Sequence, residues 1–169
     1  MPMMCRGRCF LPLISALLLL AVPAVAQWDG SADEIPFPVG LRLGYTSWES
    51  ARQVHFGGQA DLGEFVENLS FVPSLELGLG DELTVVALNG DVRWAFTEMV
   101  SDPWGLYGGG SLGLIWTDWP GADANTDLGL SVLGGLTRRF ANGHDGLLEV
   151  RLGLLDSPGC KVTLGYSLF

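Results

Sequence analysis

A strict alternation of apolar and small or polar residues recurs along most of this chain, and it constrains the fold more than any other feature. Between Trp104 and Trp116 the even positions read Trp, Leu, Gly, Gly, Leu, Leu, Trp, whereas the odd positions are mostly glycine or polar. Successive side chains of a β-strand point to opposite faces, so a period of two predicts a strand with one apolar face. Beyond its N-terminal leader the chain shows no convincing helical period.

The same alternation marks seven further segments, most of them close to the ~10 residues of a transmembrane β-strand. They cover residues 39–45, 56–62, 74–79, 86–96, 128–136, 148–154 and 161–168. Turn-forming residues separate them, as in Asn142-Gly143 and Ser157-Pro158-Gly159. Eight alternating segments in a chain of 169 residues predict an all-β fold, an eight-stranded antiparallel up-and-down transmembrane β-barrel.

The N-terminus reads as a secretory signal peptide. Arg6 and Arg8 precede an apolar run over residues 10–22, and Ala24-Val25-Ala26 forms a small-x-small cleavage site before Gln27. The run is short of the ~20 residues that a membrane anchor, the alternative reading, requires. We therefore expect a signal peptide over 1–26 that is removed between Ala26 and Gln27, a polar lead-in over 27–38 and a barrel over 39–169.

The charge balance excludes one class of partner. The chain carries 9 basic and 19 acidic residues, for a formal net charge of −10. Loss of the leader removes two basic residues and two of the three cysteines, which leaves a charge of −12 and Cys160 alone. Such a chain has no basic patch for nucleic acid and can form no intrachain disulfide.

The few charges within the alternating segments decide which face points inward. Four basic and four acidic residues lie in the polar phase: Arg42, Arg93, Arg151 and Lys161, and Asp61, Glu76, Asp91 and Glu149. This balance, in a strongly acidic chain, indicates an enclosed interior where charges must be paired. The apolar face then points to lipid. In a soluble barrel, the alternative, the apolar face would point inward and bind an apolar ligand.

Aromatic residues are predicted to form two girdles. Residues 104–116 span about 40 Å as a strand, which at a tilt of about 45° matches the ~25 Å lipid-facing band of a membrane barrel. If both termini share one rim, the aromatics fall into two groups. Phe96, Trp104, Phe140 and Phe169 lie at the rim of the termini, and Tyr45, Trp48, Trp116 and Trp119 lie at the other.

From about residue 38 to residue 169 the chain resembles the small eight-stranded outer-membrane β-barrel proteins of Gram-negative bacteria. The resemblance rests on Pro73–Asp81, Tyr107–Gly110, Thr126–Leu130 and Lys161–Tyr166. It implies residence in the outer membrane, contact with its lipid and its assembly machinery, and a monomer. Such proteins usually end in an aromatic residue, as here with Phe169. That residue is, however, out of phase with Val162, Leu164 and Tyr166.

Two motifs match ligand-binding patterns but lack the neighbouring structure or residue that these patterns require. Gly108–Gly113 fits the dinucleotide pattern G-x-G-x-x-G, but it lies inside a predicted strand with no helix after it. Asp123, Asn125 and Asp127 have the spacing of a calcium loop, but Leu128 stands where the loop requires glycine. We expect no metal and no cofactor.

Catalysis is the remaining alternative, because some small outer-membrane barrels modify lipid A. Such chemistry needs a serine or histidine with an orienting acid at the rim. His144 falls in a predicted turn, and His55 is placed near the outer rim with Ser47 and Glu49 across the same loop. The sequence favours a structural or small-ligand role without catalysis.

Overall fold

The structure is a computed structural model that describes residues 38–48, 51–80, 83–118, 121 and 123–168. Within these ranges the protein is all-β, and none of them holds a helix long and apolar enough to cross a membrane. The predicted signal peptide, its cleavage between Ala26 and Gln27, and almost all of the lead-in lie outside the described residues.

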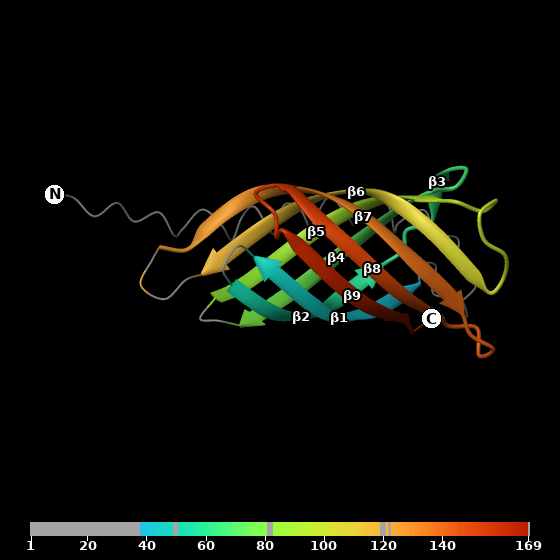
Figure 1. The fold of residues 1–169 in the computed structure, drawn as a ribbon, viewed down its shortest axis with the longest axis horizontal. Helices are drawn as coiled ribbons and strands as arrows, with labels where there is room; N and C mark the ends of the chain where they lie inside the picture. The colour runs from blue at the N-terminus through green and yellow to red at the C-terminus, as the bar shows by residue number, and fades with distance from the viewer. Residues whose placement is uncertain (1–37, 49–50, 81–82, 119–120, 122, 169) are drawn as a thin grey trace, which may run out of the picture. The chain divides into compact units, whose positions relative to one another are not determined.

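Eight long strands form the wall. Their bounds are β1 Val39–Trp48, β2 Ala51–Ala60, β4 Leu69–Gly80, β5 Leu83–Ala95, β6 Trp104–Asp118, β7 Asn125–Arg139, β8 Asp145–Leu155 and β9 Cys160–Ser167. Every neighbouring pair is antiparallel, β1 pairs with β9, and β2 also pairs with β4. These two pairings close the sheet, and the strands run obliquely around the resulting barrel (Figure 1). The predicted eight-stranded up-and-down barrel is confirmed.

A ninth, short strand was not predicted. β3, Glu64–Val66, folds back on the beginning of β4, with Glu64 opposite Ser70 and Val66 opposite Leu69. Asn68 adopts a φ of 63° in the tight turn between them, a conformation that asparagine tolerates better than most residues. Alternation over three residues is too brief to be read from a sequence.

The two ends of the barrel chain meet at one rim. The amide of Leu168 donates a hydrogen bond to the carbonyl of Val39, 2.7 Å away, so β9 ends beside the start of β1. We call this the terminal rim and the other the opposite rim. The loops after β2, β5 and β7 lie at the terminal rim.

The alternation separates an apolar exterior from a polar lumen. Outward-pointing leucines are widely exposed, as shown by Leu41 at 59%, Leu112 at 53% and Leu164 at 60%. The inward-pointing Asp91 and Glu149 are fully buried at 0%. A soluble barrel would reverse this arrangement.

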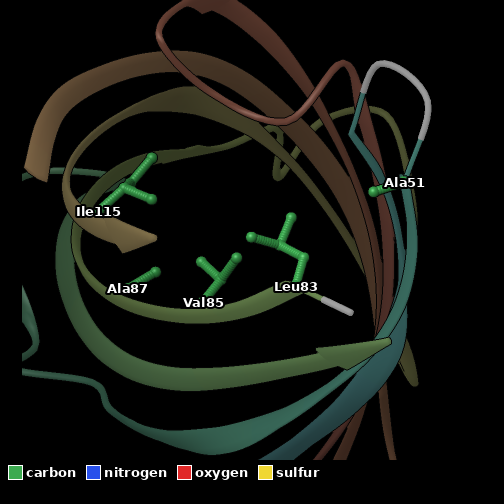
Figure 2. Close-up of a cluster of buried hydrophobic side chains, with 5 residues drawn as sticks. All are labelled: Ala51, Leu83, Val85, Ala87 and Ile115. Carbon is green, nitrogen blue, oxygen red and sulfur yellow. The ribbon is translucent and has the colours of Figure 1, made fainter. Parts of the chain in front are cut away.

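Two apolar layers of buried side chains lie in the lumen, one on either side of its charged middle. Near the opposite rim the layer consists of Ala51, Leu83, Val85, Ala87 and Ile115. Figure 2 shows these side chains on the inner wall, with Leu83, Val85 and Ile115 pointing into the barrel. The second layer, formed by Tyr107, Leu133 and Leu147, is nearer the terminal rim. The charged residues between the two layers are therefore shielded from solvent.

Candidate functional site: a charge cluster inside the lumen

Seven charged side chains from five strands meet in the middle of the lumen. All of them are buried, the most exposed being Arg93 at 8%. We call this set the lumen cluster: Arg42 on β1, Glu76 on β4, Asp91 and Arg93 on β5, Glu149 and Arg151 on β8, and Lys161 on β9. All seven were predicted to face the lumen, and the structure brings them together.

Arg42 is the centre of this cluster. Its guanidinium contacts all three carboxylates: Nη2 lies 2.5 Å from Oε1 of Glu149 and Nε lies 3.1 Å from Oε1 of Glu76. The third carboxylate, Asp91, is 3.5 Å from Nη1. Lys161 pairs with the second oxygen of Glu76. One arginine thus connects carboxylates from three different strands.

Arg93 and Arg151 are paired crosswise between β5 and β8. Nη2 of Arg93 lies 2.9 Å from Oε2 of Glu149, and Nη2 of Arg151 lies 2.7 Å from Oδ2 of Asp91. Each arginine also contacts the carboxylate on its own strand, at 3.2 Å and 3.0 Å respectively. Because β5 and β8 are not neighbours in the sheet, these contacts tie two separate parts of the wall together.

Neutral polar groups complete the cluster, and none of them was among the predicted site residues. The hydroxyl of Tyr107 donates to Oε2 of Glu149 at 2.9 Å, and its ring lies 4.9 Å from the guanidinium of Arg93. Nη1 of Arg151 donates to the hydroxyl of Ser111 at 2.8 Å. The sequence could have indicated both Tyr107 and Ser111, because they occupy odd positions within residues 104–116 and these positions face inward.

Asp61 does not join the cluster, which corrects the prediction for this residue. β2 ends at Ala60, and the Oδ1 atom of Asp61 instead accepts a hydrogen bond from the amide of Gly63 at 2.9 Å. Among the described residues the cluster therefore holds four cations and three carboxylates rather than four of each. The amide oxygen of Gln59 supplies a further acceptor, 3.2 Å from Nη1 of Arg42 and 3.5 Å from Nη2 of Arg93.

His55 lies inside the lumen, although it was predicted to lie near the outer rim. It is 2% exposed. Its Nδ1 is 2.8 Å from the hydroxyl of Thr46 and its Nε2 is 3.0 Å from that of Thr163. The prediction was wrong because β2 begins at Ala51, so Gln53 and His55 lie in its inward phase. Ser47, its suggested partner, is in the outward phase of β1, and Glu49 is outside the described residues.

A glycine on the neighbouring strand makes room for this histidine. Gly44 on β1 pairs with His55 in the sheet. A Cβ atom at Gly44 would lie 2.1 Å from the carbonyl oxygen of Val162 and 2.6 Å from Cε1 of the imidazole, closer than side chains tolerate. The ring and the backbone of the neighbouring strand β9 together occupy the space that any other residue at this position would need.

The structure describes the side chains of five of the eight predicted girdle residues. Phe96, Trp104 and Phe140 lie at the terminal rim, and Tyr45 and Trp116 toward the opposite rim. The side chain of Trp48, together with Trp119 and Phe169, is outside the described residues. Tyr166 was missed: its ring centroid lies 6.1 Å from that of Phe140 and 5.3 Å from that of His144.

The lumen contains a small cavity. A cavity of about 30 Å³ lies between the lumen cluster and the apolar layer at the opposite rim, with His55, Glu76, Arg151 and Lys161 in its wall. That volume suits roughly two water molecules.

In the suggested calcium loop, the amide of Asn125 donates to the carboxylate of Asp127 at 2.7 Å. Nowhere in the described ranges do three or more metal-ligating side chains gather.

The comparisons with known proteins define the fold. No protein-family model and no curated protein matches the chain. Among solved structures, Neisserial surface protein A aligns over 78% of this chain and 94% of its own, with 15% identity and a TM-score of 0.61. The N-terminal β-barrel domain of Pseudomonas aeruginosa OprF aligns over 76% and 94%, with 14% identity and a TM-score of 0.52. The chain has the fold of the small outer-membrane β-barrels.

Proposed function

We propose that the protein is an integral outer-membrane β-barrel with a structural role, which neither conducts ions nor catalyses a reaction. The observation that carries this proposal is the polarity of the wall. Leucine, valine and aromatic side chains are exposed all around the outside, while four cations and three carboxylates are buried inside. In water such an exterior would be an aggregation surface, whereas in a bilayer it is the expected lipid-facing band.

The soluble alternative requires the opposite arrangement. A barrel that binds an apolar ligand in water directs its apolar residues inward and its charges outward. Here the centre of the lumen holds ion pairs with side-chain exposures of 9% or less. This observation favours the membrane protein over a periplasmic carrier of apolar molecules.

A structural role is supported by the way the lumen is closed. Arg42, Arg93 and Arg151 tie strands from different parts of the wall together through shared carboxylates. Charges buried in this manner are costly unless they are paired, so the shared carboxylates favour a wall whose strands stay together. The apolar layers on both sides of the cluster also oppose the passage of hydrated ions.

The positions of the two histidines weigh against catalysis. A lipid-modifying enzyme needs its nucleophile and base where a lipid can reach them. His55 is enclosed between two threonine hydroxyls inside the barrel. His144 is at the terminal rim, where its ring lies against Tyr166 and its backbone amide donates to the side chain of Asn142. Neither histidine has a serine or a carboxylate as its hydrogen-bond partner among the described residues.

Membrane fractionation tests the proposal. The protein is expressed with its leader in a Gram-negative host, and the envelope is separated and washed with carbonate and with urea. We expect the protein to stay in the outer-membrane pellet and to shift its gel mobility on heating. Release into either wash would overturn the proposal in favour of a peripheral or soluble protein.

A further inference from the structure

One row of side chains runs across four neighbouring strands on the outer face at the terminal rim. Trp104 on β6 is paired with Arg138 on β7, Arg138 with Gly146 on β8, and Gly146 with Tyr166 on β9. All four positions lie within two residues of a strand end. The ring of Phe140 covers Gly146, where an added Cβ would approach it to 2.8 Å. Arg138 therefore lies beside two aromatic rings, those of Trp104 and Phe140.

The next outward row marks where the apolar belt begins. Two residues further into the wall, Leu106, Leu136, Leu148 and Leu164 are consecutive cross-strand partners. Two strand residues at the tilt of a membrane barrel correspond to a height of roughly 5 Å. If the leucines contact acyl chains, as the proposed function requires, Arg138 lies at the level of the lipid head groups.

Unlike the adjacent Arg139, Arg138 has no carboxylate partner among the residues that the structure describes. The adjacent Arg139 is paired with Asp145, with Nε 3.2 Å from Oδ1. Arg138 is exposed and makes no ion pair within the described residues. Its guanidinium lies 5.1 Å from the ring centroid of Trp104 and 5.8 Å from that of Phe140. A guanidinium held over an aromatic ring is attracted by the face of the ring, and its N–H groups can still donate hydrogen bonds to an anion.

We propose that Trp104, Arg138, Phe140 and Tyr166 form a binding site for the head group of an anionic phospholipid, in the leaflet on the side of the chain termini. Arg138 donates to the phosphodiester, a geometry that suits the guanidinium fork. The flanking rings hold the guanidinium at the interface, and the leucine row contacts the acyl chains. The hydroxyl of Tyr166 accepts a hydrogen bond from the amide of Asn142 at 3.1 Å and can donate its own proton to the lipid. This inference rests on the membrane location proposed above.

The test compares Arg138→Gln with Arg139→Gln, two neighbouring arginines of which only the first lies between the rings. Protein folded in micelles with equal amounts of phosphatidylglycerol and phosphatidylcholine is measured by intact-complex mass spectrometry. We expect the wild type and Arg139→Gln to retain phosphatidylglycerol preferentially. Arg138→Gln should lower that preference about fivefold, the effect of one interfacial arginine. The preference of Arg138→Lys should fall between that of the wild type and that of Arg138→Gln.

Three outcomes would overturn the site. The first is an unchanged lipid preference in Arg138→Gln. The second is an equal loss of preference in Arg139→Gln, which would mean that the net charge of the rim alone sets the preference. The third is displacement of the lipid by excess inorganic phosphate. Heat-dependent gel mobility verifies that each variant is folded. A wild type that does not insert into bilayers would contradict the proposed function itself, whereas insertion without lipid preference would contradict only this inference.

Discussion

Arg151 on β8 and Asp91 on β5 lie 2.7 Å apart across the lumen, although 60 residues separate them in the chain. Both side chains are almost completely buried, at 5% and 0% exposure. Two strands stand between β5 and β8 in the sheet, so the pair bridges the barrel instead of linking neighbours. The presence of this ion pair therefore indicates that the whole wall is closed.

This relationship predicts strong coupling between the two residues. Arg151→Met or Asp91→Leu alone leaves a buried charge without its partner and should lower the free energy of unfolding by about 3–5 kcal/mol. The double variant should cost clearly less than the sum of the two. The measurement is a double-mutant cycle of urea unfolding in detergent micelles.

The exposed pair Arg139 and Asp145 is the matched control for that cycle. Its side chains are 72% and 38% exposed. Their coupling should stay below about 1 kcal/mol. Additive effects in the Arg151 and Asp91 cycle would show that this ion pair contributes nothing to closure.

A charged residue on the outer wall should lower the stability of the barrel only where the wall contacts lipid. Leu112 lies near the middle of β6 and is 53% exposed. Leu112→Arg should cost about 2–4 kcal/mol when the protein is folded in a bilayer. Asp118→Arg, on the same face at the end of β6, should change stability little. Equal small effects of both substitutions would indicate an exterior that faces water.

Gly44 and Gly58 offer a matched pair on adjacent strands. A Cβ at Gly44 would lie 2.1 Å from the carbonyl oxygen of Val162 and 2.6 Å from Cε1 of His55, whereas a Cβ at Gly58 would find only a backbone oxygen at 3.7 Å. Gly44→Ala should therefore destabilise the barrel by about 1–3 kcal/mol through overpacking. Gly58→Ala should be nearly neutral. Thermal unfolding in detergent measures both, and a Gly44→Ala variant as stable as wild type would contradict the close packing described around Gly44.

The closed lumen predicts the absence of steady ion conductance. Planar bilayers that contain the purified protein should show no open state of constant size. Leu83→Ser together with Ile115→Ser removes part of one apolar layer. The double variant should still not conduct, because the lumen cluster and the second layer remain. A stable conductance in the wild type would contradict the described packing of the interior.

The strand pattern and the inward phase of the lumen cluster could be predicted because alternation is a local property of the sequence. The pairing inside the lumen could not, since it depends on which positions face one another across a closed wall. Asp61 illustrates the limit: alternation cannot locate the end of β2, and one residue past that end the side chain bonds to the loop. His55 was misplaced for the same reason at the start of β2.

The aromatic row around Arg138 shows a second limit. Trp104 and Phe140 could be predicted at the rim from their positions next to turns. That Arg138 lies between them depends on the register of β6 with β7 and on Gly146, which leaves room for the ring of Phe140. Register is set by the pairing of whole strands and cannot be read from either strand alone.

The most direct test of the account is the accessibility of single nitroxide labels along β6 in bilayers. The background is a chain that begins at Gln27 with Cys160→Ser, and labels are placed at Ser111, Leu112, Leu114 and Ile115. Collision with apolar oxygen should be high at 112 and 114 and low at 111 and 115, because the even positions face lipid. The inverse result, with even positions reached by a water-soluble nickel relaxant and not by oxygen, would contradict a barrel whose leucine face lies in the membrane.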